Sequence, residues 1–129
     1  MSSARYAHNP KPEKSVKVYG RGIAVSTKYS VLVCRKITGM SLQKGKNILS
    51  GLAEERLDMD GKHYTTISKE LLSMLNSAES NAEFKGLEPS RLMIHASAHK
   101  AFSYFRPRGM KRRREKRKMT NLQVVLEQR

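Results

Sequence analysis

Residues 64–87 read YTTISKELLSMLNSAESNAEFKGL, and the apolar residues of this stretch recur at steps of three and four. Because an α-helix has 3.6 residues per turn, this spacing places them on a single stripe. We therefore predict a helix from about Tyr64 to Phe84. The stripe that would face the core consists of Ile67, Leu71, Met74, Leu75, Ala78 and Ala82.

The flanks of this helix carry signals of their own. Gly86 is suited to the C-terminal cap, and Pro89 prevents the helix from resuming. Upstream, residues 58–61 (DMDG) predict a turn, since the downstream glutamate that a calcium loop requires is not at the required spacing. Three acidic residues fall off the apolar stripe and are expected to face water: Glu70, Glu79 and Glu83.

After the helix, the hydrophobic period changes from 3.6 to two. Apolar residues alternate from Leu92 to Ala98, with His95 and His99 among the residues of the opposite face. A second alternating run covers Leu122 to Leu126. This period predicts two β-strands. Between them lies the segment 100–118, KAFSYFRPRGMKRRREKRK.

The segment 100–118 holds ten basic residues and one acidic residue, a net +9 of the chain's +15. Such a segment cannot bury enough apolar surface to fold alone, so it needs a partner that neutralises it. Six of the ten basic residues are arginines, whose guanidinium groups pair bidentately with phosphate and stack on bases. We predict nucleic-acid binding; a nuclear-localisation patch and a solvated loop are the alternatives.

The predicted RNA-binding residues are the basic residues of this segment, its two adjacent aromatic residues and one arginine between glycines near the N-terminus. They are Lys100, Tyr104, Phe105, Arg106, Arg108, Lys111, Arg112, Arg113, Arg114, Lys116, Arg117, Lys118 and Arg21. The aromatic rings offer faces on which unpaired bases could stack.

Toward the N-terminus, residues 1–14 contain Pro10 and Pro12 and predict an irregular arm before a single domain over 15–129. Val16 and Val18 begin a strand, and the apolar phase then slips across residues 20–22 (GRG). A β-bulge at the glycines explains that slip. A phosphate-binding glycine loop is the weaker alternative.

Two shorter helices are expected before residue 64. The first covers Thr27 to Thr38, with Ser26 as N-cap and Gly39 at the C-cap position. Ser41 would cap the second. The inward residues of the first are Val31, Leu32 and Ile37, and those of the second are Leu42, Ile48, Leu49 and Leu52.

Other classes of protein find little support. Cys34, the one cysteine, lies in an apolar run, so we expect a buried small hydrophobe and no disulfide. No apolar stretch approaches the roughly 20 residues that span a bilayer, and the N-terminus lacks a signal sequence. His95 and His99 would lie roughly 13 Å apart on a strand, too far for one metal. We predict no catalytic residues, no metal, no cofactor and no small-molecule substrate.

Four collinear segments resemble one family. Residues 78–87 (AESNAEFKGL) are similar to the third helix of the universal large-subunit ribosomal protein L twenty-two, in its archaeal and eukaryotic L seventeen branch. Residues 20–40, 92–95 and 105–110 (FRPRGM) resemble its first strand and helix, its next strand and its hairpin tip. The likeness covers roughly residues 12–127, as a compact version: about ten residues, 54–62, stand where relatives usually hold a basic insertion.

The resemblance implies an α/β (α+β) fold, three helices on a three-stranded antiparallel sheet, with a long β-hairpin projecting over about 96–122. It also implies a non-enzymatic constituent of the large ribosomal subunit, cytoplasmic, assembled in the nucleolus if the cell is eukaryotic. In the family the hairpin crosses ribosomal RNA to line the exit tunnel, with Arg106, Arg108, Lys111 and Arg112 mapping near the tip. The implied partners are that RNA, neighbouring ribosomal proteins and the nascent chain, and no membrane.

Overall fold

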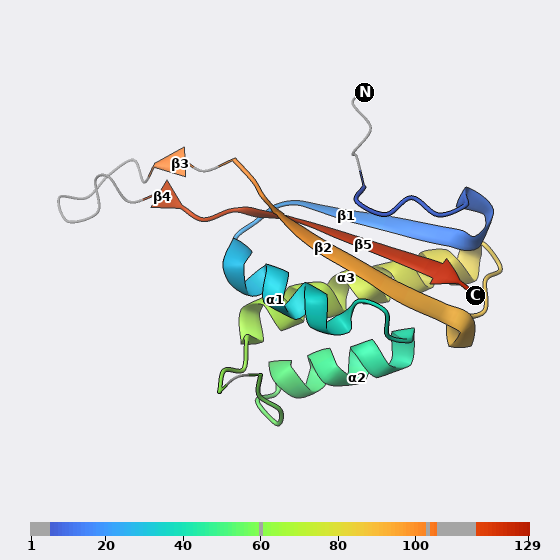
Figure 1. Ribbon diagram of the computed structural model, residues 1–129, viewed down its shortest axis with the longest axis horizontal. Coiled ribbons are helices and arrows are strands. Elements are labelled where there is room, and N and C mark those ends of the chain that lie inside the picture. Colours follow the sequence, from blue (N-terminus) through green and yellow to red (C-terminus); the bar gives the residue numbers. More distant parts are fainter. Residues whose placement is uncertain (1–5, 60, 103, 106–115) are drawn as a thin grey trace.

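The computed structural model describes residues 6–59, 61–102, 104–105 and 116–129. Its body has two layers, with the three α-helices on one side of an antiparallel sheet (Figure 1). The sheet has the order β1-β5-β2. Its strands are β1 (Ser15–Ile23), β2 (Leu92–Lys100) and β5 (Thr120–Gln128). This architecture confirms the expected α+β fold of three helices on a three-stranded antiparallel sheet.

The helices are α1 (Thr27–Ile37), α2 (Leu42–Ala53) and α3 (Thr65–Phe84). Two short 3-10 turns, η1 (Pro12–Lys14) and η2 (Pro89–Arg91), precede strands β1 and β2. Beyond the body, β3 (Tyr104–Phe105) pairs with β4 (Lys116–Arg117). The element boundaries lie within about two residues of those that the periodicity predicts.

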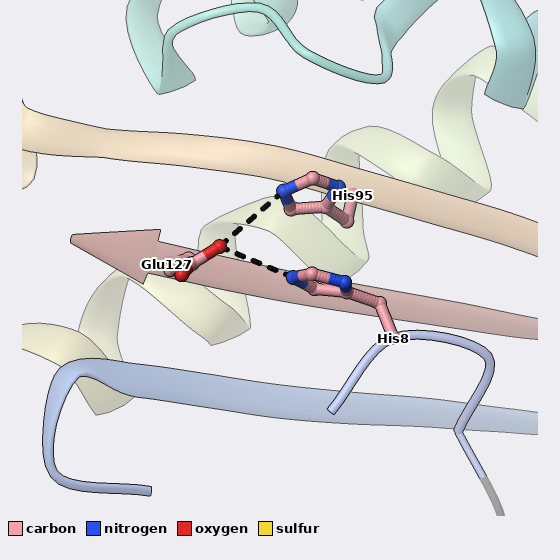
Figure 2. Close-up of side chains that lie close together, drawn as sticks. All are labelled: His8, His95 and Glu127. Atoms are coloured by element: carbon pink, nitrogen blue, oxygen red, sulfur yellow. Dashed lines mark hydrogen bonds and ion pairs between the residues drawn. The ribbon is translucent and has the colours of Figure 1, made fainter. Parts of the chain in front are cut away.

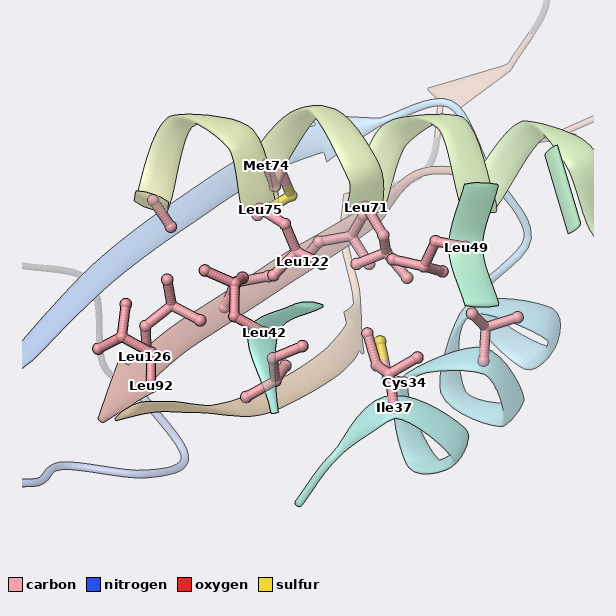
Figure 3. Packing of buried hydrophobic residues seen from close by; sticks show 14 of the residues in the cluster. Cys34, Ile37, Leu42, Leu49, Leu71, Met74, Leu75, Leu92, Leu122 and Leu126 are labelled. Atoms are coloured by element: carbon pink, nitrogen blue, oxygen red, sulfur yellow. The ribbon is translucent and has the colours of Figure 1, made fainter. Parts of the chain in front are cut away.

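The core forms where α3 lies across the sheet and against α2 (Figure 3). All six residues of the predicted α3 stripe are buried, as expected. They share one core with the inward side chains of the sheet, where α3 lies over β1 and β5 and α1 lies over β2. Leu92, Ile94 and Leu122 of that sheet face are fully buried. The apolar stripe of α3, which follows the helical period, thus packs on the apolar face of the sheet, which follows the period of two.

The slip in the β1 pattern is a register shift, as predicted. β1 pairs regularly with β5 up to Gly20–Leu122, and the register shifts between Gly20 and Ile23. Gly22 has a φ of +64°, which a glycine adopts at little cost, and its N–H donates to Asn121 Oδ1 at 2.9 Å. The glycines are therefore part of the strand.

Three expectations about the helices are wrong in detail. The buried side of α1 consists of Ser30, Val33, Cys34 and Ile37, whereas Val31 and Leu32 are half-buried. Spacings of three and four define that side, and the run of apolar residues 31–34 hid it. In α2, Leu42, Leu49 and Leu52 are buried as predicted, but Ile48 is half-buried.

The N-caps and one glutamate also differ from expectation. Ser26 and Ser41 occupy the N-cap positions, but neither side chain makes a capping hydrogen bond. Glu70 and Glu83 are exposed, whereas Glu79 is half-buried and forms an ion pair with Lys46. The packing of α2 on α3 brings Lys46 to it, which the pattern of one helix cannot predict.

Cys34 is buried in this core, as predicted, and is 2% exposed. Burial raises the pKa of its thiol to about 12, so the nucleophilic thiolate is scarce at neutral pH. We expect the folded protein to resist a thiol-specific disulfide reagent for hours at pH 8. One thiol per chain should react at once in guanidinium chloride. Rapid reaction of the folded protein would contradict the buried position.

Candidate nucleic-acid interface

The central strand β5 and the edge strand β2 continue beyond the body of the protein. β2 and β5 pair without a shift from Leu92–Gln128 to Lys100–Thr120. The Ala101 N–H then donates to the Met119 carbonyl at 3.1 Å, and β3 pairs with β4 further out. In Figure 1, β3 and β4 lie well away from the helices. The described ends of the basic segment, residues 100–102, 104–105 and 116–118, therefore continue the line of these two strands.

Of the thirteen predicted RNA-binding residues, six lie outside what the structure describes, and four more are described only in their backbone. For Tyr104, Phe105, Lys116 and Arg117 it describes the backbone pairing alone. Lys100, Lys118 and Arg21 are fully described and exposed. The predicted positions that fall in the undescribed part are Arg106, Arg108, Lys111, Arg112, Arg113 and Arg114.

The described residues include a group of lysines at the base of this extension, which we call the root cluster: Lys28, Lys100 and Lys118. The three side chains line one shallow pocket of about 200 Å³ together with Ser26, Thr27 and Met119. Lys100 ends β2, Lys118 precedes β5, and Lys28 lies in the first turn of α1. The lining contains no acidic residue, so a polyanion is the natural counter-charge.

Two hydroxyl groups hold the start of α1 against β5 and so place Lys28 in the root cluster. The Thr120 hydroxyl donates to the Val25 carbonyl at 2.8 Å. Its oxygen accepts from the Thr27 hydroxyl, also at 2.8 Å. Thr120 is fully buried, and its hydrogen bond to Val25 is shielded from water. Sequence reasoning missed Lys28 because its neighbours in the chain carry no unusual charge.

Arg21 reaches the same end of the molecule through the register of the sheet. It is exposed on β1 between Gly20, which pairs with Leu122, and Ile23, which pairs with Thr120. Lys118 lies two residues before Thr120 in the chain. Three of the predicted residues therefore lie at the same end of the sheet: Lys100, Lys118 and Arg21.

A second, aromatic pocket adjoins the root cluster across Ser26. It has a volume of about 260 Å³ and is lined by the loop between β1 and α1, by Tyr29 of α1 and by the start of α3. The rings of Tyr29 and Tyr64 lie 5.4 Å apart at 59°. Lys62 Nζ donates to the Tyr29 hydroxyl at 3.0 Å, and this hydrogen bond is the main reason the pKa of Tyr29 is lowered. Sequence reasoning missed both tyrosines, because single aromatic residues in separate parts of the chain carry no local signal.

The two histidines of β2 have different surroundings. His99 is exposed near the end of β2, whereas His95 is half-buried and stacked on His8 of the N-terminal arm. That contact joins positions 87 residues apart in the chain. None of the helices that the structure describes has the length and apolarity required to cross a bilayer.

Comparison with known families agrees with this architecture. The family description "Ribosomal protein L22p/L17e" matches residues 18–127. The chain therefore belongs to the Ribosomal protein L22p/L17e family, and it is a structural ribosomal protein, not an enzyme.

Among its relatives, the large ribosomal subunit protein uL22 of Methanococcus aeolicus is 32% identical, with 99% of each chain covered. The uL22 protein of Thermofilum pendens is 32% identical over 78% of each chain, and that of Methanocaldococcus jannaschii is 28% identical over 99% and 97%. The Methanococcus aeolicus alignment spans 151 positions, more than the 129 residues of this chain. That relative therefore contains segments that this compact chain lacks.

Proposed function

We propose that this protein is a constituent of the large ribosomal subunit that binds ribosomal RNA through its basic extension and the root cluster. The observation that carries the proposal is the placement of charge. A segment with a net charge of +9 joins strands β2 and β5, and three exposed lysines from three parts of the chain converge at the ends of these strands. The names of the relatives support the assignment to the large ribosomal subunit.

The proposed mechanism is neutralisation of several RNA segments at once. Residues 106–115 would lie deepest in the RNA and line the polypeptide exit tunnel, next to the nascent chain. The root cluster would hold phosphates where the extension leaves the body. Because the grooves of RNA duplexes are hard to read, selectivity would come from shape and from splayed bases. The pocket of Tyr29 and Tyr64 is suited to stack one such base.

Neighbouring large-subunit proteins are further proposed partners, and the proposed location is the cytoplasmic ribosome, with nucleolar assembly in a eukaryotic cell. The rival proposal is a free regulator of nucleic acid. It would need a helix with an exposed basic or amide face. The longest helix, α3, instead exposes Glu70 and Glu83, which phosphate repels.

Sedimentation tests the proposal. In a sucrose gradient of native lysate, the protein should co-migrate with the large subunit and remain there after a high-salt wash. A variant with all three root lysines changed to glutamate (Lys28→Glu, Lys100→Glu, Lys118→Glu) should be released by that wash. The matched control changes three exposed lysines of the helices, Lys36, Lys44 and Lys69, to glutamate and should stay bound.

Wild-type protein found at the top of the gradient at both salt concentrations would overturn the ribosomal assignment and favour the regulator. If both triple variants are retained equally, the assignment to the large subunit stands, but the root cluster is not part of the RNA interface. Circular dichroism of each variant checks that the fold is intact.

A further inference from the structure

The N-terminal arm covers the face of the sheet that the helices leave open. The Ala7 N–H donates to Gln123 Oε1 at 3.0 Å, and Lys17 Nζ donates to Asn9 Oδ1 at 3.0 Å. Val125 and Gln123 point away from the helix layer, yet they are only 2% and 6% exposed. The arm therefore packs on the sheet, and it carries His8 to a fixed place.

Three side chains from distant parts of the sequence converge beneath this arm (Figure 2). His8 Nε2 lies 3.1 Å from Glu127 Oε2, and His95 Nε2 lies 3.5 Å from the same oxygen. The two imidazole rings stack with centroids 3.9 Å apart and planes at 26°. One ligand atom from each of the three residues falls within 4.8 Å of the others.

Two further observations indicate that this cluster is built for a ligand. His95 Nε2 is buried, and apart from the 3.5 Å ion-pair contact with Glu127 Oε2 it has no hydrogen-bond partner among the residues that the structure describes. A buried polar nitrogen in that state costs free energy unless a water or an ion satisfies it. A cavity of about 150 Å³, lined in part by His8, His95 and Ser97, opens beside the rings and has room for coordinating water.

We propose that His8, His95 and Glu127 form a transition-metal site, best suited to Zn²⁺, that fastens the N-terminal arm to the sheet. Two imidazole nitrogens and one carboxylate oxygen are a common zinc ligand set that leaves a fourth position for water. Ligand atoms of a tetrahedral zinc site lie roughly 3.3 Å apart, since each is about 2.0–2.2 Å from the metal. The distances to Glu127 Oε2 already match.

Closing the site requires the rings to rotate out of their stacked arrangement so that their nitrogens converge on one ion. His8 can supply it, because its segment belongs to no strand or helix of the sheet. The positive charge of Arg129 acts on both Glu127 and His95 and opposes a cation. The site should therefore bind more weakly than four-ligand structural zinc sites do.

Titration with zinc sulfate tests the site on the full-length protein, freed of RNA at high salt. Calorimetry should give one Zn²⁺ per chain, and saturation at about a hundredfold excess over Kd should raise Tm by roughly 5–10 °C. His8→Ala and Glu127→Gln should each weaken binding at least about tenfold. His99→Ala, which removes an exposed histidine of the same strand, should bind as the wild type does.

Cobalt substitution adds a spectroscopic measurement that nonspecific binding of metal to the protein surface does not affect. Co²⁺ in the site should give the visible bands of a four-coordinate ion in the wild type and in His99→Ala, and none in His8→Ala. If Zn²⁺ fails to raise Tm, or if His99→Ala loses as much affinity as His8→Ala, the cluster is only a hydrogen-bonded contact and the metal site is refuted.

Discussion

Affinity for large-subunit ribosomal RNA should fall by roughly 10³–10⁵ between 50 and 200 mM monovalent salt. The basic segment 100–118 carries ten cationic side chains, and neutralising about eight phosphates releases the counterions that give this salt dependence. The measurement is the dissociation constant for a ribosomal RNA fragment at four or five salt concentrations. The slope of log affinity against log salt counts the phosphates that are neutralised.

A triple variant makes this prediction specific to the extension. Arg112→Ala, Arg113→Ala and Arg114→Ala together should reduce the slope by about two to three and weaken binding at low salt by several orders of magnitude. The control replaces Lys36, Lys44 and Lys69 with alanine, removing the same charge from the helices. If both variants change the slope equally, binding follows net charge alone and the extension has no special role.

The second large effect concerns stability. Leu75→Ala should destabilise the protein by about 2–5 kcal/mol, since Leu75 is fully buried where α3 meets the sheet and the truncation leaves a cavity. Urea unfolding followed by circular dichroism measures this as a lower midpoint with a similar slope. In a domain of marginal stability, such a loss is a large part of the total.

Phe84→Ala is the matched control for that experiment. It removes a larger side chain from the same helix, but Phe84 is 95% exposed. Its expected effect is within about 0.5 kcal/mol, as for most surface substitutions. A comparable loss from both substitutions would mean that α3 does not pack on the sheet through the stripe that contains Leu75.

The elements of this fold could be predicted from the sequence because each depends on a local pattern. The α3 stripe, the two alternating strands and the slip at residues 20–22 follow from the periods of helices and strands, and the structure has all of them. The basic segment was equally visible, since charge is a property of composition. Its placement between two strands also followed from the chain order.

Predictions from the pattern of a single helix were wrong where a neighbour from another element determines the burial of a side chain. The run of apolar residues 31–34 does not say which of them face β2 and α3, so Val31 and Leu32 were placed wrongly. The pattern of α3 predicts that Glu79 faces water, but the packing of α2 places Lys46 beside it. Lys28 gains its role from hydrogen bonds that hold α1 against β5.

The sequence by itself determined the two-layer class, the core stripe of α3 and the concentration of positive charge between the last two strands. Each of these depends on the spacing or the composition of residues that are close together in the chain. Only the tertiary structure decided which side chains meet: the root cluster, the paired tyrosines and the group of His8, His95 and Glu127. Those contacts join residues up to 119 positions apart, and their geometry depends on strand register and on the path of the arm.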